Sequence, residues 1–357
     1  MKILVKKNKL IFLLFFLSNL IVSIMAFFIL PEKYFYDSKT IISPEFRLSG
    51  FIGSYEFTQR FYELTLYKNL PYPIIALIQY PILIYILYKI GVPKYFHILT
   101  VKNIIVYIAF FMLALFVSMP SKEFITFLYI SMIPFVFNNP KRSDRNKIIL
   151  VLFLITLFGV FRIYYVLIPI IAVGIYYVSL INFKNKVLTS IFYGILIVVF
   201  ISLTHGFIKG EYLSESTREE LNTERKYSKD ANSMIVSPVK TDTWYGETVG
   251  IFNGFIAVNI PVLEGIKHFL TPQIVAFIVW QLFLLYILLV RFSRCLKDRE
   301  KYKFELWSII ILFSYYIVQG LFEPDLGTAT RHKIGFFPLV YFIFYYEYFR
   351  KDIQKNN

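Results

Sequence analysis

Two arginines interrupt apolar stretches of this sequence, and their side chains suit the binding of phosphate groups. Arg162 lies in LFGVFRIYYVLIP, with apolar residues for about a dozen positions on each side. Arg331 lies in EPDLGTATRHK, between two apolar runs near the end of the chain. A guanidinium donates paired hydrogen bonds to phosphate oxygens, so two guanidiniums on one face would suit a pyrophosphate. The alternative for Arg162 is a side chain that extends to the lipid headgroups from a helix end.

Carboxylates and histidines are the side chains that would exchange a proton with a substrate. Asp37 follows the first apolar run in YFYDSKTI, where it would act as a base or, alternatively, cap the segment 38–43. His268 lies near the end of GETVGIFNGFIAVNIPVLEGIKHFL, and Glu323 precedes the last apolar run. The candidate catalytic residues are therefore Asp37, His268 and Glu323.

Other polar and aromatic residues would help to hold a sugar phosphate. Glu323 and Asp325 would orient the Arg331 guanidinium or contact sugar hydroxyls, or one of them would only form a loop-stabilising ion pair with the arginine. His332 directly follows that arginine. Trp244 and Tyr245, in TDTWYGE, would stack on a sugar ring, or would anchor the chain at a membrane interface. The candidate substrate-binding residues are therefore Arg162, Arg331, Asp325, His332, Trp244 and Tyr245.

The elements that must position these residues are membrane helices. Of the 357 residues, 57% are hydrophobic and only 17% are charged, whereas a soluble domain carries about a quarter charged residues. Several apolar runs approach the roughly 20 residues that cross a bilayer core. The sequence predicts an all-α, polytopic helical bundle, a single transmembrane domain over 1–357 with about ten transmembrane helices. The predicted segments are about 10–30, 72–90, 103–119, 123–138, 148–161, 163–181, 188–204, 272–292, 305–322 and 334–349.

Two stretches of this topology have alternatives. Residues 148–181 lack a strong turn signal, so we predict two short helices that meet near Arg162, with one long tilted helix as the alternative. Residues 246–270 are broken by Gly and Pro, which indicates an interfacial or re-entrant segment instead of a full span. The charged run ESTREELNTERKYSKD predicts a solvated helix, with a lid over the substrate as the alternative.

The distribution of positive charge sets the expected orientation. With the N-terminus inside, the inner segments hold 22 Lys and Arg against 6 acids, and the outer segments hold 16 against 17. Cytoplasmic loops carry the excess of Lys and Arg, so both termini are expected in the cytoplasm. The loops 31–70 and 205–271 and the segment EPDLGTATRHK then all lie on the outer face.

Several classes of chemistry lack their usual sequence signals. The single Cys295 allows no intramolecular disulfide and no cysteine-based zinc site, and the four histidines lack ligand spacing. The inner loops are short and basic and contain no phosphate-cradling glycine motif. We therefore predict no cofactor, no metal and no nucleic-acid partner, with the chemistry at the extracytoplasmic interface.

The layout resembles the O-antigen and capsular polysaccharide polymerases (Wzy-type) of bacterial surface-glycan synthesis. The resemblance rests on about ten spans, a large outer loop, embedded arginines, and the segments YFYDSKTI and EPDLGTATRHKIGFFPL. It implies a GT-C-like membrane glycosyltransferase of the bacterial inner membrane, acting in capsule or lipopolysaccharide synthesis. Such an enzyme transfers an undecaprenyl-pyrophosphate-linked glycan donor onto a second lipid-linked repeat unit, and a chain-length regulator is a further expected partner.

The resemblance also implies roles for particular residues. Arg162 and Arg331 fit the arginines that hold the donor pyrophosphate, whereas the base is left between Asp37 and His268, because the histidine–asparagine pattern of the related ligases is missing. One rival is another polyprenyl-linked-sugar glycosyltransferase of GT-C type, in which a first-loop carboxylate such as Asp37 is the base. A second rival is a flippase for lipid-linked glycans, which internal repeats would favour, and the sequence has none.

Overall fold

The computed structural model describes residues 6–43, 50–225, 233–262, 265 and 272–355. Across these residues the chain is all-helical, and the only β-type pairing in them is an isolated bridge between Met234 and Asp325. Five of the described helices are long and apolar enough to cross a membrane: α1 (Lys7–Ile29), α4 (Tyr72–Ile90), α10 (Lys186–Lys209), α14 (Pro272–Lys297) and α15 (Lys303–Phe322). The all-helical prediction is confirmed for the described residues, and the apolar helices indicate a membrane-embedded protein.

The chain divides into two compact units. The first comprises residues 1–151, 160–163 and 331–357, and the second comprises 152–159 and 164–330. The boundary passes through α8 (Asp144–Leu157), through the break that follows it, and through α16 (Leu326–Gly335). The segment that carries Arg162 and the last turn of α16 therefore both belong to the first unit.

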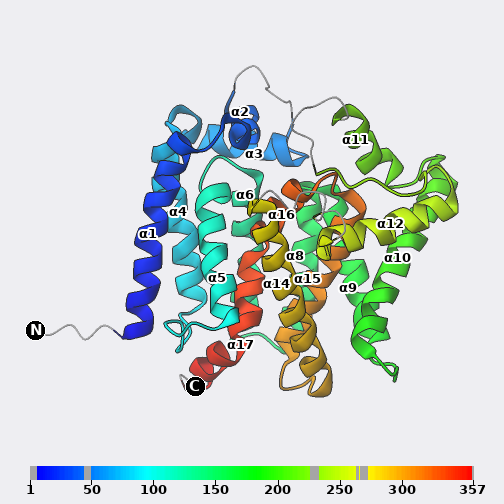
Figure 1. The fold of residues 1–357 in the computed structure, drawn as a ribbon. Helices are drawn as coiled ribbons and strands as arrows, with labels where there is room; N and C mark the ends of the chain where they lie inside the picture. Colours follow the sequence, from blue (N-terminus) through cyan, green and yellow to red (C-terminus); the bar gives the residue numbers. More distant parts are fainter. Residues whose placement is uncertain (1–5, 44–49, 226–232, 263–264, 266–271, 356–357) are drawn as a thin grey trace, which may run out of the picture. The chain divides into compact units, whose positions relative to one another are not determined.

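The first unit is a group of helices around α4 (Tyr72–Ile90). That helix packs against α1 (Lys7–Ile29), and α1 also contacts α5 (Val101–Met112). The remaining full helices of the unit are α2 (Tyr36–Ile42), α3 (Ser54–Leu64), α6 (Lys122–Ile130), α7 (Met132–Asn138) and α17 (Phe337–Lys355). In Figure 1, α2 and α3 lie at one end of this unit, whereas α1 begins and α17 ends at the opposite end.

Helix boundaries in the first unit follow from capping residues. Thr100 and Ser121 accept hydrogen bonds from backbone N–H groups in the first turns of α5 and α6. Gly91 ends α4 with a φ of +142°, and a Cβ there would lie 2.5 Å from the ring of Phe349. Only glycine suits that position, because it permits both the positive φ and the close approach of α17.

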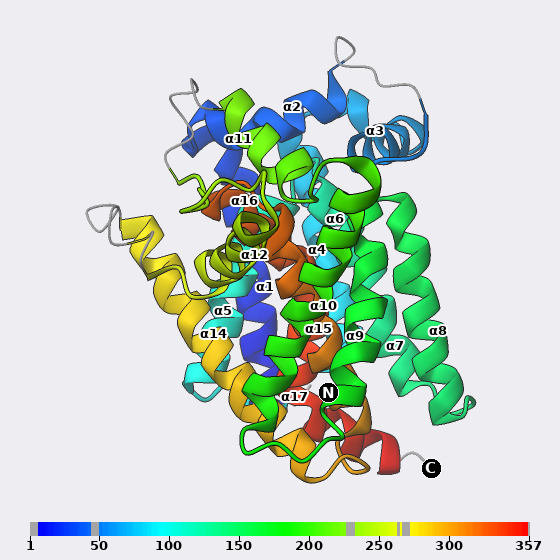
Figure 2. The ribbon, with the colours of Figure 1, turned by 90° about the vertical axis from the view of Figure 1, so that its right-hand side faces the viewer.

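The second unit is built around α15 (Lys303–Phe322), in which every residue from Glu305 to Leu321 is buried. It packs against α9 (Leu167–Val178) and α12 (Trp244–Asn259). The remaining helices of this unit are α10 (Lys186–Lys209), α11 (Glu220–Arg225) and α14 (Pro272–Lys297). Figure 2 shows α9 and α10 side by side, whereas α14 is tilted away from their direction.

Helix α12 reaches α15 through glycines. A Cβ on Gly254 would lie 1.9 Å from the carbonyl oxygen of Gly320, and 2.3 Å from a guanidinium nitrogen of Arg218. Small residues at a helix crossing allow two backbones to approach closely. The absence of a side chain at Gly254 therefore makes this crossing possible.

We expect Gly254→Ala to destabilise the second unit, because even a methyl group there must displace backbone. An overpacked site of this kind costs roughly 1–3 kcal/mol. The measurement is thermal unfolding of the detergent-solubilised protein, with Val249→Ala at an exposed position of the same helix as the control. Equal melting temperatures for the two variants would contradict the close crossing.

The structure tests several predicted segments. A helix is found at each of the ten predicted apolar stretches. The stretch 148–181 is broken as predicted: α8 ends at Leu157, and single helical turns at Phe158–Val160 and Ile163–Val166 flank Arg162 before α9 begins. Within 246–270, residues up to 259 belong to α12, and 263–264 and 266–270 lie outside the described residues.

The prediction of a solvated helix over ESTREELNTERKYSKD is wrong for its first part. A π-helical turn at Glu215–Glu219 precedes α11, and the Arg218 side chain within it is fully buried. That guanidinium donates to the carbonyl oxygens of Gly320, at 3.0 Å, and Gly250, at 3.3 Å. The backbone carbonyls of α12 and α15 satisfy a charge whose burial the local sequence does not indicate.

Candidate functional site

A cluster of charged side chains gathers in the first unit from five separate parts of the chain. Helices α2 and α3 contribute one residue each, the start of α6 contributes two, the break after α8 contributes one, and the C-terminal half of α16 contributes two. We call this group the charged cluster: Asp37, Tyr55, Lys122, Glu123, Arg162, Arg331 and His332.

The accessible part of the cluster is centred on Asp37. One carboxylate oxygen of Asp37 lies 3.1 Å from Nη1 of Arg331, and the other accepts a 2.7 Å hydrogen bond from the Tyr55 hydroxyl. The Lys122 ammonium lies 3.9 Å from the same carboxylate and 3.6 Å from the centre of the Tyr55 ring. The Asp37 and Arg331 side chains remain 26% and 29% exposed, so solutes can reach this ion pair.

The buried part of the cluster is a triad formed by Arg162, Glu123 and His332. Nη2 of Arg162 lies 3.3 Å from Oε1 of Glu123 and 3.0 Å from Nε2 of His332, and that ring nitrogen lies 3.2 Å from the same carboxylate oxygen. Nε2 can donate to Glu123 only when it carries a proton, and can accept from Arg162 only when it does not. Whether Nε2 carries a hydrogen therefore decides which of the two it binds.

Arg162 is positioned by the loop that precedes α3. The N–H of Gly53 donates a 3.1 Å hydrogen bond to the carbonyl oxygen of Val160, and the ring of Phe161 meets that of Phe57 edge-on at 5.6 Å. Because the helix stops before Arg162, these contacts can hold the arginine on a short turn between two helices. The side chain is only 5% exposed, which excludes an arginine extended to the lipid headgroups.

Contacts around the first turn of α6 position Lys122 and Glu123. Ser121 caps this helix, and its own N–H donates to the Tyr62 hydroxyl at 3.3 Å. The Ser38 hydroxyl donates to the carbonyl oxygen of Pro120 at 2.8 Å, which ties α2 to the same turn. These bonds hold the Asp37-bearing helix and the first turn of α6 together.

The last turn of α16 meets α6 at a glycine. A Cβ on Gly335 would lie 2.9 Å from the side chain of Thr126, so the lack of a side chain allows the two helices to approach closely. Arg331 and His332 stand one turn earlier on α16. The glycine therefore helps to bring both residues to the start of α6.

The charges of the cluster determine the ionisation of Asp37. Burial opposes ionisation of this carboxyl, but Lys122 and Arg331 together outweigh burial and hold the pKa of Asp37 below its ordinary value. Burial, followed by the Asp37 charge, raises the pKa of Tyr55, so its hydroxyl remains a donor. Asp37 is thus a carboxylate at neutral pH, and it is a weak base while both cations remain beside it.

The charge balance of the cluster favours the binding of an anion. The cluster contains two guanidiniums, one ammonium and two carboxylates, so its cationic groups outnumber its anionic groups. Only the outer pair of Arg331 and Asp37 is substantially exposed. An anionic ligand that reached Arg331 would compete with Asp37 for the guanidinium.

The ion pairs of Asp37 give a pH-dependent stability. Because the folded protein lowers the pKa of Asp37, its pairs stabilise the fold above the ordinary Asp pKa of about 3.9, and this contribution is lost as the pH falls through the lower, folded-state pKa. We expect Asp37→Asn to lower the melting temperature at pH 7, and to lower it progressively less below about pH 4. A difference between wild type and variant that stays constant from pH 7 to pH 3 would contradict the pairing.

Four of the residues predicted from the sequence meet in this cluster: Asp37, Arg162, Arg331 and His332. The carboxylate that pairs with Arg331 within the first unit is Asp37, for which the sequence indicates a base or a helix cap. In this structure Asp37 is an ion-pair partner for two cations, and it is held by the Tyr55 hydroxyl.

Glu323 and Asp325 belong to the second unit. Asp325 accepts hydrogen bonds from the N–H and the hydroxyl of Thr328, both at 2.7 Å, so it caps the start of α16. Glu323 is buried at the C-terminal end of α15 and accepts a 3.2 Å hydrogen bond from Gln319. Both contacts stabilise the corner between α15 and α16, the helix that carries Arg331.

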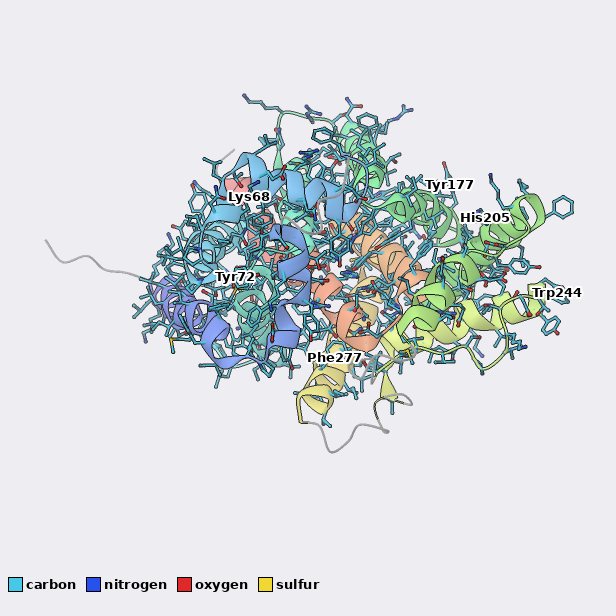
Figure 3. The ribbon with its side chains drawn as sticks, turned by 90° about the horizontal axis from the view of Figure 1, so that it is seen from above. Lys68, Tyr72, Tyr177, His205, Trp244 and Phe277 are labelled. Carbon is cyan, nitrogen blue, oxygen red and sulfur yellow. The ribbon has the colours of Figure 1, made fainter. Side chains whose placement is uncertain are left out.

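The two predicted aromatic residues also belong to the second unit, at the start of α12. Trp244 and Tyr245 are exposed, and their rings meet edge-on at 5.7 Å. Figure 3 shows Trp244 at the outer edge of this unit, together with His205 near the end of α10. Their exposure suits either of the two roles expected for them. His268 lies outside the described residues.

Lys122, Glu123 and Tyr55 are members of the cluster that the sequence analysis does not single out. A local signal for two of them exists: SKE directly precedes the apolar run FITFLYI, as a helix cap with charge in the first turn. Such a pair is common at solvated helix ends, so only the tertiary contacts distinguish it. Among the described residues, no group of three or more His, Cys, Asp or Glu side chains is arranged to hold a metal ion.

Compared with known proteins, the chain matches no family model, no curated protein and no solved structure.

Proposed function

We propose that this protein is a membrane glycosyltransferase that polymerises undecaprenyl-pyrophosphate-linked oligosaccharide repeat units. The proposed site of action is the outer leaflet of the bacterial inner membrane, in O-antigen or capsule synthesis, with both termini in the cytoplasm. The observation that carries the proposal is the charged cluster, in which Arg331, Lys122 and Arg162 gather around two carboxylates and a histidine.

The leaving group explains why such a cluster would catalyse transfer. As the bond between the anomeric carbon and the pyrophosphate breaks, negative charge grows on the leaving oxygen. Fixed cations then stabilise the transition state more than the ground state. Arg331 is accessible and can offer its paired N–H donors to the pyrophosphate, with Lys122 beside it as a second cation. No metal ion is needed for this charge stabilisation.

Asp37 would have two successive roles. Without substrate it is the counter-ion of Arg331 and Lys122, which keeps these cations in place. A bound pyrophosphate would take over both cations, and its negative charge would raise the pKa of Asp37. The carboxylate could then accept the proton of the acceptor hydroxyl while that oxygen bonds to the anomeric carbon and the pyrophosphate leaves with the electron pair.

The buried triad would hold the cluster in shape. Glu123 fixes Arg162 and His332 at distances of 3.2–3.3 Å, and His332 adjoins Arg331 on α16. Preorganised charges of this kind need no rearrangement during the reaction. The polyprenyl chain would lie along the apolar helices, and Trp244 and Tyr245 would meet the sugars if their unit faces the glycan.

A second candidate function is transfer from a polyprenyl-monophosphate sugar. The exposed carboxylate of Asp37, hydrogen-bonded to Tyr55, favours it, because a first-loop carboxylate is the expected base in such enzymes. The two functions differ in the lipid released, which is a pyrophosphate in the first case and a monophosphate in the second. The number of phosphates on the donor that supports transfer separates them.

Deletion of the gene in its own bacterium tests the proposal at the level of the cell. Loss of a polymerase should leave single repeat units on the lipid or on the surface core, whereas loss of a flippase should remove the surface glycan altogether. Complementation with the wild-type gene should restore long chains. Unchanged chain lengths in the deletion strain would contradict the proposal.

A further inference from the structure

A cavity of about 180 Å³ lies in the first unit, at the end where α17 terminates. It is formed by the connection between α4 and α5, the first turn of α5, and the middle of α17. The charged cluster contributes no residue to it. Its lining residues are Pro93, Tyr95, Ile98, Thr100, Lys102, Asn103, Tyr345 and Tyr348.

The lining combines one cation with aromatic rings. The Lys102 ammonium lies 4.9 Å from the ring centre of Tyr345 and 5.5 Å from that of Tyr348. Tyr348 in turn meets Tyr95 edge-on at 6.0 Å. The rings present carbon faces and hydroxyl groups, and the ammonium presents charge, so the cavity suits an anionic group attached to a small carbon skeleton.

The cavity is held in shape by hydrogen bonds of Asn103. Its side chain donates to the carbonyl oxygens of Tyr95, at 2.9 Å, and Ile98, at 2.7 Å, and accepts a 2.6 Å bond from the Tyr345 hydroxyl. The side chain of Asn8 on α1 donates to the carbonyl of Pro93 at 3.0 Å. The walls from three parts of the chain are therefore fixed before any ligand arrives.

An apolar surface leads away from the cavity along α5. Val101, Ile104, Ile108 and Phe111 are all exposed, and their spacing places them on one face of the helix. In a membrane this face contacts hydrocarbon. A ligand with its anionic group in the cavity and its tail along α5 would thus be an amphiphile.

We propose that this cavity binds the phosphate-bearing headgroup of an anionic phospholipid, with an acyl chain along the exposed face of α5. A basic pocket at the end of membrane helices is a common place for such headgroups. The Lys102 ammonium would contact the phosphate, and the tyrosine rings would contact the glycerol carbons. This site is separate from the charged cluster and does not depend on the proposed reaction.

The test measures the thermal stability of the full-length protein in neutral detergent while lipid is added. We expect phosphatidylglycerol to raise the melting temperature saturably, and phosphatidylcholine or inorganic phosphate to have little effect. Lys102→Gln should raise the half-saturating phosphatidylglycerol concentration about five-fold or more, as expected for the loss of one charged contact. Lys89→Gln is the matched control, because Lys89 stacks on Tyr85 at 5.2 Å and does not line the cavity.

A second variant tests the proposal independently, in case Lys102→Gln does not fold. Ile98→Trp fills the cavity from an exposed position and keeps the charge, so it should also weaken the phosphatidylglycerol effect. Equal responses of wild type, Lys102→Gln and Ile98→Trp would overturn the proposal, as would equal effects of the two lipids. Stabilisation by inorganic phosphate that depends on Lys102 would identify a free-anion site instead and would overturn the lipid assignment.

Discussion

Replacing Arg331 with alanine should abolish glycan polymerisation while the protein still folds and inserts. The guanidinium is 29% exposed and pairs with Asp37, so its loss leaves no deeply buried charge without a partner. Removing one fixed donor from a developing negative charge lowers the rate by about 10²–10³-fold in comparable sites. The measurement is the length distribution of the polymer in cells that express the variant at the wild-type level.

Two further variants make the Arg331 result specific. Arg331→Lys keeps the charge but loses the paired donors, so an intermediate rate is expected. Arg60→Ala is the matched control, because Arg60 lies in the same unit, is 31% exposed and pairs with Glu63 at 2.9 Å. Polymer of wild-type length in the Arg331→Ala strain would contradict the role of this arginine.

Replacing Arg162 with alanine should have the second large effect, on stability as well as activity. The change leaves the carboxylate of Glu123, which is 4% exposed, with only His332 from the buried triad. Breaking a buried ion pair from one side costs about 3–5 kcal/mol. We expect a clear fall in the melting temperature of the solubilised protein, together with loss of polymer.

The double variant Arg162→Ala, Glu123→Gln separates the two effects. Without a buried carboxylate the missing guanidinium is no longer needed for charge balance, so most of the stability should return. Activity should not return, because the cluster has lost one of its cations. Recovery of both stability and polymerisation would mean that Arg162 serves only as a structural ion-pair partner.

Much of the helical framework can be predicted from the sequence. Apolar runs of sufficient length mark the helices, and the break near Arg162 follows from an arginine that a continuous membrane helix would accommodate poorly. The same reasoning selects Arg162 and Arg331 as candidates, because a charged residue between apolar runs is rare unless it binds a ligand or pairs with another charge. Both arginines belong to the cluster found in the structure.

The pairing of charges in the cluster cannot be predicted in the same way. Asp37 and Arg331 lie near opposite ends of the sequence, and only the packing of α2, α6 and α16 brings them together. Local pattern favours a partner for Arg331 close in sequence, such as Asp325, which caps the first turn of α16. Sequence spacing therefore identifies the cations more reliably than their partners.

Arg218 illustrates the same limit in the second unit. Its run of alternating charges has the composition of a solvated helix. The guanidinium is nevertheless buried, beside the Glu219 carboxylate at 3.4 Å, where the carbonyl oxygens of Gly250 and Gly320 from two other helices converge on it. A charge satisfied by backbone carbonyls gives no signal in the side-chain pattern of its own segment.

The most direct measurement of the central claim uses the purified protein in lipid vesicles, supplied with an undecaprenyl-pyrophosphate-linked oligosaccharide as both donor and acceptor. We expect the wild-type protein to form a ladder of polymer and to release one undecaprenyl pyrophosphate for each unit added, and the Arg331→Ala variant to form neither product. Transfer that requires a polyprenyl-monophosphate sugar instead, or a ladder of equal length from the Arg331→Ala variant, would contradict the account.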